Sequence, residues 1–203
     1  MILQCKDNEF ACSDGACISI HKRCDIIKDC SDKSDEMQCK SFVIDDYLKE
    51  DPPVKERNGN GTELFMNVTV FSISNFDEIH MTYKARFSLN LRWLDWRVTF
   101  LNLKSRENFN SIGDDDLKKL WLPRLIFSNF DENNLKFDTL SSVVVKRIGS
   151  PTLNLPVEVN EDEMFEGELN PFEYNRTYEM TLECNFVLEK YPFDHQDCHI
   201  DVS

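Results

Sequence analysis

Strict alternation of apolar and polar residues is the clearest pattern in this chain, and it is strongest between residues 83 and 93. One side of the pattern is apolar throughout: Tyr83, Ala85, Phe87, Leu89, Leu91 and Trp93. The residues between them are polar or charged: Lys84, Arg86, Ser88, Asn90 and Arg92. An antiparallel strand with one buried face has this period of two, whereas a helix would scatter the apolar residues around its axis. The pattern therefore predicts a strand that faces a core.

Similar alternation predicts further strands. Ahead of the first strand, an apolar series alternates with a mixed one: Leu64, Met66, Val68 and Val70 against Phe65, Asn67, Thr69 and Phe71. Other strand candidates lie at 97–103, 134–138, 142–148, 153–159, 177–188 and 198–203. In the segment 177–188 the predicted inward residues are Tyr178, Met180, Leu182, Cys184, Phe186 and Leu188. Short, regularly spaced strands without long helices predict a mainly β chain with an immunoglobulin-like β-sandwich.

Turn signals separate the first 40 residues from the rest of the chain. Asp51-Pro52-Pro53 and Asn58-Gly59-Asn60-Gly61 are typical of loops. Just before them, four residues have the spacing of one face of a short helix: Phe42, Val43, Tyr47 and Leu48. Asp114-Asp115-Asp116 predicts the start of another helix, because acidic residues are favoured in a first turn. We therefore expect one domain at residues 1–40 and a second at 41–203.

Charge narrows the range of partners. The 203 residues include 23 Lys and Arg against 37 Asp and Glu, a net charge of −14. Nucleic acid is excluded as a partner, because phosphate binding requires the opposite sign. An acidic surface of this kind has two interpretations: it keeps the protein soluble, or it lines a vestibule that attracts cations. The chain contains no apolar run of 18 residues, so we expect no membrane span within it. The cysteines indicate secretion, and because no leader sequence opens the chain, we expect it to be truncated or processed at its N-terminus.

Six of the eight cysteines lie between Cys5 and Cys39, which indicates an oxidising compartment and a disulfide framework. A segment this short needs disulfides, a metal or both in order to fold. Six cysteines allow 15 pairings, and spacing alone does not choose among them. The acids between Cys24 and Glu36 could together surround calcium, which takes 6–8 oxygen ligands.

The pattern Phe10-x-Cys12, Gly15-x-Cys17-Ile18, Cys24-Asp25, Asp29-Cys30 and Ser34-Asp35-Glu36 resembles the low-density lipoprotein receptor class A module over residues 5–39. The resemblance implies the disulfides Cys5–Cys17, Cys12–Cys30 and Cys24–Cys39. It also implies a calcium ion held by the side chains of Asp25, Asp29, Asp35 and Glu36 and by the carbonyls of Lys22 and Ile27. Modules of this family that capture a ligand lysine carry an aromatic residue where this chain has Lys22. We therefore favour a structural role over cargo capture, and a solvated surface role for Asp32.

A second signature lies near the end of the chain. Cys184 and Cys198 enclose 13 residues that include Tyr191-Pro192-Phe193-Asp194, and this resembles the Cys-loop receptors, which are pentameric neurotransmitter-gated ion channels. Three other segments resemble the same family: Tyr47 to Val54, Trp93-x-Asp95-x-Arg97, and the segment from Trp121-x-Pro123 to Asn129. The resemblance covers residues 42–203 and implies a disulfide Cys184–Cys198. It also implies that Tyr191, Pro192, Phe193 and Asp194 press on the membrane domain and transmit ligand binding to the gate; the alternative is a bridged hairpin in which the proline only sets a turn.

The resemblance further implies that transmitter binds between neighbouring subunits. Positions that would face the ligand are Arg86, Ser88, Asn90, Ile126 and Ser128. Amine-binding members of the family place an aromatic residue where Ser88 stands, and amino-acid-binding members place an arginine where Asn90 stands. Neither group is present. Arg86 and Arg92 could bind a carboxylate instead, but we favour the alternative that they are ordinary solvated side chains of a strand.

The remaining chemistry is sparse. His195, Cys198 and His199 could be drawn as a zinc cluster, but the expected disulfide uses Cys198. Scattered histidines and the absence of a nucleophile or phosphate-loop motif predict that the chain is not an enzyme. Sequons at Asn60, Asn67 and Asn175 predict N-glycosylation.

The sequence thus predicts the extracellular part of a ligand-gated channel subunit at the plasma membrane, including synapses, with a calcium-binding module at its N-terminus. Its expected partners are a small-molecule transmitter, the other subunits of a homo- or hetero-pentamer, and the membrane through segments outside this chain. One alternative is a soluble binder of the acetylcholine-binding-protein type without a pore. Another is a cargo-binding receptor that acts through the class A module. We expect the chain to be a fragment of a longer subunit.

Overall fold

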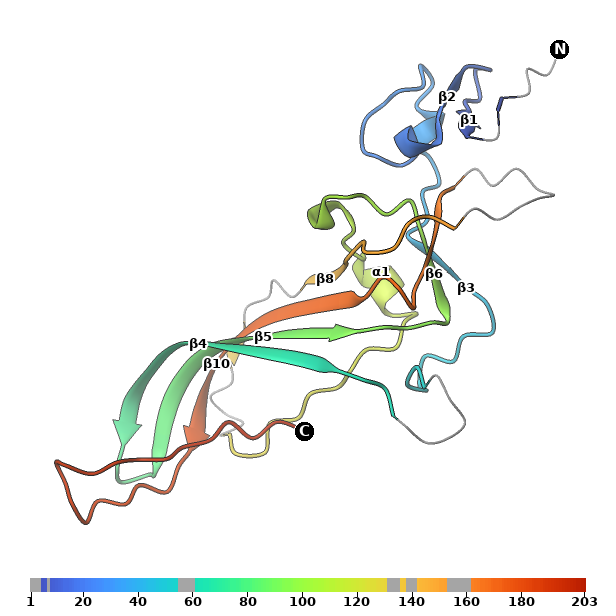
Figure 1. The fold of residues 1–203 in the computed structure, drawn as a ribbon. Coiled ribbons are helices and arrows are strands. Elements are labelled where there is room, and N and C mark those ends of the chain that lie inside the picture. Colours follow the sequence, from blue (N-terminus) through green and yellow to red (C-terminus); the bar gives the residue numbers. More distant parts are fainter. Residues whose placement is uncertain (1–4, 7, 55–60, 131–135, 138–141, 153–161) are drawn as a thin grey trace. The chain divides into compact units, whose positions relative to one another are not determined.

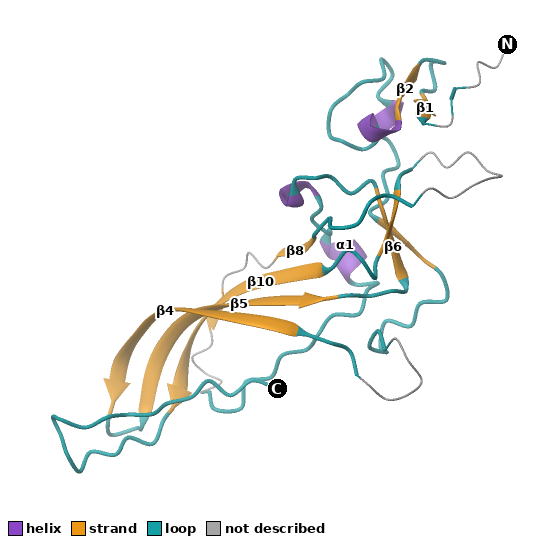
Figure 2. Cartoon of the chain, viewed as in Figure 1, coloured by secondary structure: helices purple, strands orange, loops and turns teal. Residues whose placement is uncertain are grey.

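The computed structural model describes residues 5–6, 8–54, 61–130, 136–137, 142–152 and 162–203 (Figure 1). These residues are mainly strand with a few short helices, as the sequence predicts (Figure 2). In the part of the chain described, no helix is both long and apolar enough to cross a membrane. The predicted strand at 153–159 and the sequon at Asn60 lie outside the described residues.

The chain divides into two compact units. The first unit contains Met1–Glu63, Trp93–Trp121 and Val144–Glu173, and the second contains Leu64–Arg92, Leu122–Val143 and Tyr174–Ser203. These units are defined by compactness, so a domain boundary near residue 40 stays a prediction.

The N-terminal part of the first unit is a small cysteine-rich module, residues 5–39. Its two strands, β1 (Glu9–Ala11) and β2 (Cys17–Ser19), pair antiparallel, and two 3-10 turns follow at Ile20–Lys22 and Ser34–Glu36. Its core holds little more than Phe10, Cys12 and Cys30. So small a core cannot offset the entropy of ordering the chain, so the module depends on its disulfides.

The rest of the first unit is built on a three-stranded sheet in the order β3 (Phe42–Ile44), β6 (Val98–Leu101), β9 (Met164–Glu166). Apolar side chains from these strands and their neighbours pack together; Phe100 is fully buried and contacts Phe172 edge-on, and Phe172 stacks on Trp93 at 5.2 Å. A 3-10 turn at Glu107–Phe109 and the helix α1 (Asp114–Leu117) follow β6, so the prediction of a helix starting at Asp114 is confirmed.

The predicted helix over 42–48 is wrong. Residues Phe42–Ile44 form β3, and Phe42 lies opposite Phe100 in an antiparallel pair with β6. Neighbouring apolar residues fit one face of a short helix as well as a strand, and here the hydrogen bonds offered by β6 decide between them. Tertiary pairing therefore overrides the local pattern.

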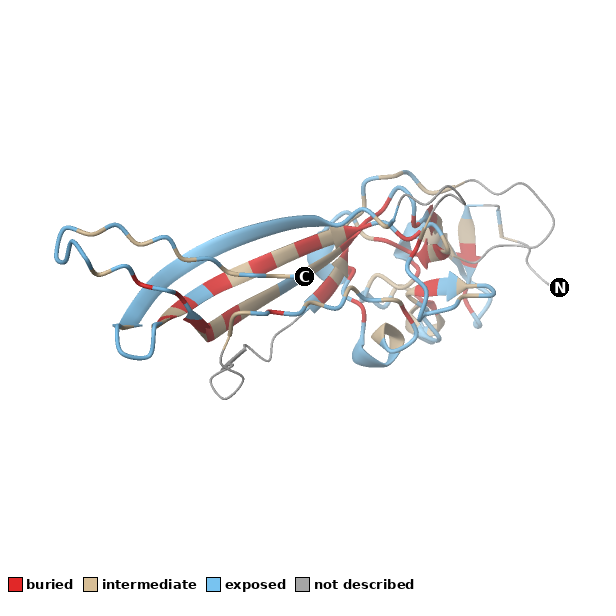
Figure 3. Ribbon diagram, turned by 90° about the horizontal axis from the view of Figure 1, so that it is seen from below, coloured by how far each residue is buried: buried red, intermediate tan, exposed pale blue. Residues whose placement is uncertain are grey.

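The larger sheet has the order β4 (Phe65–Asp77), β5 (Thr82–Trp93), β10 (Phe172–Glu183), β7 (Lys136–Phe137), and β8 (Ser142–Val145) also pairs with β10. The prediction for residues 83–93 is confirmed, because all six apolar members are at most 3% exposed. Figure 3 shows the resulting alternation of burial along β5 and β10. In the second unit these strands form one core with Phe127: Tyr83, Ala85, Phe87, Leu89, Tyr178, Met180, Leu182, Cys184 and Phe186.

Two strand predictions need correction. β4 forms as predicted, but neither of its faces is buried among the described residues; its large apolar side chains are 43–62% exposed (Figure 3). β4 is also an edge strand, paired with β5 alone. Residues 198–203 form no extended strand; Val202 makes an isolated bridge to Phe127, flanked by an exchange of hydrogen bonds between Ile126 and Ser203.

A buried ion pair ties together the loops of the first unit. The Asp95 carboxylate is fully buried and receives two hydrogen bonds from the Arg97 guanidinium, each 2.8 Å long, and one from the Tyr47 hydroxyl, also 2.8 Å. Arg97 continues to the carbonyls of Leu48 and Asp51, and the Tyr47 hydroxyl accepts the Trp121 amide. Burial raises the pKa of Tyr47 to about 12, so this hydroxyl keeps its proton.

We expect Asp95→Asn to destabilise the fold by about 3–5 kcal/mol, because it leaves the mostly buried Arg97 guanidinium without its counter-charge. Chemical denaturation measures the change. Asp115→Asn is the matched control, since Asp115 pairs with Lys118 at the surface and should contribute about 0–1 kcal/mol. Equal effects of the two substitutions would contradict a structural role for the buried pair.

Gly167 should tolerate no side chain. A Cβ atom there would lie 2.1 Å from the carbonyl oxygen of Asp95 and 2.5 Å from that of Val98, and backbone atoms cannot move aside as a side chain can. Gly167→Ala should therefore cost about 1–3 kcal/mol or more in unfolding free energy. Gly61→Ala, where nothing lies within 4 Å, is the control and should be close to neutral. A neutral result for Gly167→Ala would contradict the close backbone contact at this turn.

Candidate functional site

All eight cysteines are in disulfides. In the module these are Cys5–Cys17, Cys12–Cys30 and Cys24–Cys39, and the fourth is Cys184–Cys198. This is the pairing that the two resemblances imply. The disulfide Cys184–Cys198 also rules out zinc ligation by Cys198, because a bonded sulfur cannot act as a thiolate ligand.

The acids expected to hold calcium lie in the loop between Cys24 and Cys39, with Asp35 at its centre. The Asp35 side chain is completely buried; its Oδ2 atom accepts the Asp29 amide at 2.6 Å, whereas Oδ1 has no hydrogen-bond partner among the described residues. A buried carboxylate oxygen without a partner is costly. A cation would relieve this cost, so the donor set fits calcium.

The other three acids of the expected calcium site are engaged with the protein. Glu36 accepts the Asp25 amide at 2.8 Å, and Asp25 accepts the Ile27 amide at 2.8 Å. Asp29 accepts from the Lys22 ammonium at 2.5 Å, and this contact raises the pKa of Lys22. Among the described residues, no three of these carboxylates bring an oxygen each within 4.8 Å of one another. Calcium coordination would therefore require these side chains to turn inward.

Asp32 takes no part in that arrangement. Its Oδ1 atom accepts hydrogen bonds from the Ser34 amide and hydroxyl. This is a local cap on the turn Ser34–Glu36, consistent with a surface role.

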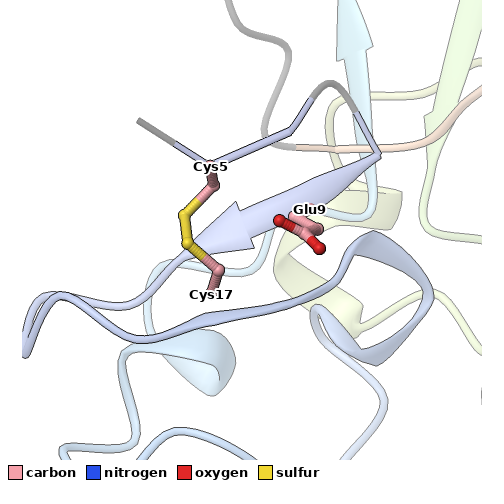
Figure 4. Close-up of side chains that lie close together, drawn as sticks. All are labelled: Cys5, Glu9 and Cys17. Carbon is pink, nitrogen blue, oxygen red and sulfur yellow. A yellow bond between two sulfur atoms is a disulfide. The ribbon is translucent and has the colours of Figure 1, made fainter. Parts of the chain in front are cut away.

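A second group of potential ligands, Cys5, Glu9 and Cys17, comes together at the edge of the module (Figure 4). The two sulfur atoms are bonded to each other, so they offer no thiolate. The Glu9 carboxylate instead accepts the Lys6 amide at 3.1 Å. This group is therefore a structural contact rather than a metal site.

In the second unit, the disulfide Cys184–Cys198 closes a loop with an exposed tip. Phe193 is 91% exposed and Tyr191 is 67% exposed, and the peptide bond between Tyr191 and Pro192 is cis. A free phenyl ring at this exposure contributes nothing to a core. The side chain is therefore available to a partner surface.

Gln196 holds this loop in shape, a role that the sequence did not reveal. Its side-chain amide accepts from the Val187 amide at 2.9 Å and donates to the Val187 carbonyl at 3.0 Å, which ties the two arms together. The same amide donates to the Asp194 carboxylate. Gln196 thus fixes the direction of Asp194, next to the exposed Phe193.

The base of the loop is held by Asn129. Its side chain donates to the His199 carbonyl at 2.8 Å and accepts the Asp201 amide at 3.0 Å, and its backbone carbonyl accepts the Glu183 amide. Tyr83 adds a hydrogen bond to the same His199 carbonyl, at 2.9 Å. The loop is therefore anchored to the buried core of the second unit.

The predicted ligand-facing residues divide between two places. Arg86, Ser88 and Asn90 lie on the outward face of β5, where Arg86 is exposed and Asn90 donates to the Asn175 side chain at 2.7 Å. Ile126 and Ser128 are exposed on either side of the buried Phe127. Asn67 and Asn175 are both exposed, as N-glycosylation requires.

Comparison with protein-family models identifies both parts of the chain. Residues 3–39 match the low-density lipoprotein receptor domain class A, and residues 36–162 match the neurotransmitter-gated ion-channel ligand binding domain. The second match covers more than half of the chain. The chain therefore belongs to the family of neurotransmitter-gated ion-channel ligand-binding domains and carries a class A module at its N-terminus.

Individual relatives agree with this assignment. The chain is similar to a gamma-aminobutyric acid receptor subunit beta-like protein of Drosophila melanogaster, with 26% identity over 71% of this chain and 27% of the relative. It is also similar to a gamma-aminobutyric acid receptor subunit beta of Lymnaea stagnalis, with 25% identity over 85% of this chain and 33% of the relative. The chain thus spans a third or less of these relatives, which are receptor subunits and not enzymes. The module alone is 47% identical over 36 residues, which is 18% of this chain and 2% of the relative, to a vitellogenin receptor of Solenopsis invicta.

Proposed function

We propose that this chain is the extracellular ligand-binding part of a pentameric ligand-gated ion channel subunit, in which transmitter bound between subunits opens the pore through the loop Cys184–Cys198. The observation that carries the proposal is the exposed Phe193 beside Asp194, on a loop whose arms are tied by Gln196. An exposed phenyl ring and a directed carboxylate are suited to a partner surface with one apolar and one basic contact. The pore-forming part of the subunit would supply that surface.

Exposed apolar side chains along β4 support assembly with other subunits. Seven of its residues leave large apolar groups 43–62% exposed: Phe65, Met66, Val68, Val70, Phe71, Ile73 and Phe76. Large exposed apolar patches on a soluble surface mark interaction sites. Copies of this chain, or related subunits, are the partners that we propose.

The transmitter that we propose is a small amino acid. The matched receptor subunits are named for gamma-aminobutyric acid, and the exposed Arg86 on β5 offers a guanidinium to a ligand carboxylate. Asn90, where an arginine would be expected for this class of ligand, is bound to Asn175 instead. We therefore assign the carboxylate contact to Arg86 rather than to position 90.

The place of action that we propose is the outer face of the plasma membrane. Four disulfides and three N-glycosylation sequons support an oxidising, extracellular environment.

The cofactor that we propose is calcium, in the module. The side chains of Asp25, Asp29, Asp35 and Glu36 and the carbonyls of Lys22 and Ile27 would hold it, and the support is the buried Asp35 oxygen without a partner. Calcium would supply the cross-link between turns that the small core cannot. This is a structural role.

Phe193→Ala should raise the transmitter concentration for half-maximal current about tenfold or more, because it removes the proposed apolar contact with the pore-forming part. Folding should be unchanged, because a side chain 91% exposed contributes little to stability. The measurement is whole-cell current, with the chain expressed within its complete subunit in cells that lack transmitter-gated currents, and with gamma-aminobutyric acid applied.

The matched control is Val187→Ala, an apolar truncation on the same loop at a side chain 60% exposed. It should leave the current unchanged. If both variants respond like the wild type, coupling through Phe193 is refuted; if the wild-type subunit carries no transmitter-gated current but binds transmitter, a soluble binder without a pore replaces the channel.

Asp29→Asn should abolish the protection that calcium gives the three module disulfides against reduction by dithiothreitol, because it removes one of the charges that hold the ion. The rate of thiol release with and without calcium measures this protection. Asp32→Asn is the control and should keep it, since Asp32 only caps a local turn. If the wild-type module is reduced at the same rate with and without calcium, no calcium site is formed.

A further inference from the structure

Arg23 is a charged residue of the module that is almost completely buried, at 6% exposure. Its guanidinium lies over the Phe10 ring at 4.7 Å, and its Nη1 atom donates to the carbonyls of Ser34 and Asp35 at 3.2 and 2.5 Å. Its Nε atom has no hydrogen-bond partner in the described part of the chain. This side of the guanidinium faces the Asp162 carboxylate, 3.8 Å away, which is outside the module and just ahead of β9.

Asp162 is held ready for this contact. Its Oδ1 atom accepts from the Asn102 side chain at 2.7 Å, and Asn102 is bound to the backbone of Glu163 through both its side chain and its own amide. Asn102 itself is buried and has a left-handed backbone (φ 53°), a conformation that asparagine tolerates better than most residues. The Asp162 carboxylate therefore has a fixed direction and loses little conformational entropy when it pairs with Arg23.

A second cationic side chain, Lys104, reaches from the rest of the first unit to the module. Lys104, which follows β6, donates from its ammonium to the Arg23 carbonyl at 3.0 Å. Both backbone groups of Lys104 are bound by the Asn110 side chain, which also reaches the Val145 carbonyl, so its starting point is rigid. Burial lowers the pKa of the Lys104 ammonium, and the carboxylates of Asp25, Glu163 and Glu36 partly oppose this shift.

Other residues near these contacts also come from both the module and the rest of the first unit. A cavity of about 170 Å³ is lined on one side by Cys24, Asp25 and Cys39 of the module and on the other by residues 101–104 and 109–112. The His21 ring nitrogen of the module also lies 3.0 Å from the Glu163 carboxylate. Side chains from both sides thus interlock across the module's acidic loop.

We propose that Arg23 and Lys104 lock the class A module onto the rest of the ligand-binding domain, so that the module's partner is its own chain. Each cation comes from one side and finds its acceptor on the other: Arg23 with Asp162, and Lys104 with the Arg23 carbonyl. The lock places a lysine ammonium against the acidic loop of the module. A lysine from a separate protein would have to displace it.

The lock also couples to the proposed calcium site, and this part rests on that proposal. The Lys104 ammonium is bound to the Arg23 carbonyl, two residues before Asp25, and Lys104 and Asp25 line the same cavity. Asp25 is one of the proposed calcium ligands. Two positive charges near the same carboxylates repel each other. Docking of the module and calcium binding therefore weaken one another, and by linkage the effect is reciprocal.

The test is hydrogen–deuterium exchange on the full chain with the double variant Asp162→Asn and Lys104→Met. Asparagine keeps the acceptor for Asn102, and methionine keeps the apolar stem of Lys104, so both changes remove charge with little loss of packing. Exchange in peptides covering 20–26 and 100–104 should become at least about tenfold faster, while exchange in β5 stays unchanged. Unchanged exchange in both peptides overturns the lock.

The matched control is Asp115→Asn with Lys118→Met, which removes an exposed ion pair elsewhere in the same unit. It should leave both peptides as in the wild type. Faster exchange throughout β5 in the double variant would mean general destabilisation. The single variant Lys104→Met, which leaves the Arg23–Asp162 pair in place, then decides. If hydrogen exchange in the peptide 20–26 is not faster in this variant than in the wild type, the lock is overturned.

Calcium titration by calorimetry tests the coupling. Lys104→Met should tighten calcium binding by about two- to tenfold, because a positive charge near the ion is removed. Equal affinity in wild type and variant overturns the coupling. Failure of the calcium proposal itself looks different: then neither protein binds the ion.

Discussion

The Asp95 carboxylate has no exposed surface, and much of the first unit is arranged to keep its charge paired. Arg97 satisfies both of its oxygens and then extends to the carbonyls of Leu48 and Asp51. The Tyr47 hydroxyl joins the same group and accepts the Trp121 amide. Segments that are far apart in sequence are therefore fixed relative to one another by one buried charge. Removing one member leaves the others desolvated and unpaired, which is why such a network is cooperative.

The cysteine-rich module follows a different principle, because it is too small to bury a core of useful size. Three disulfides limit its unfolded state, and the Arg23 guanidinium bridges the carbonyls of Ser34 and Asp35. Backbone carbonyls that a larger domain would satisfy by secondary structure are here satisfied by one side chain. The buried Asp35 Oδ1 atom still lacks a hydrogen-bond partner among the described residues. The proposed calcium ion would bind this oxygen.

The second unit combines a rigid core with an exposed loop. Alternate residues of β5 and β10 pack with Phe127 into one apolar cluster, and Asn129 and Tyr83 connect the ends of the loop Cys184–Cys198 to that cluster. Near its ends the loop packs Phe186 and Leu188 against the core, whereas at its tip the Phe193 side chain is 91% exposed. A stiff connection behind an exposed tip is what a signal between two domains requires.

The sequence by itself determined the elements whose two faces differ, such as β5, because alternation records directly which side chains leave water. It also pointed to both families, because the cysteine spacing and the residues around the cysteines match their motifs. Only the tertiary structure decided that Phe42–Ile44 is a strand, that both faces of β4 are exposed, and that Gln196, Arg23 and Lys104 hold loops together. The physical reason is the same in each case: these outcomes depend on which distant segment offers a hydrogen bond or a charge, and local pattern carries no record of that partner.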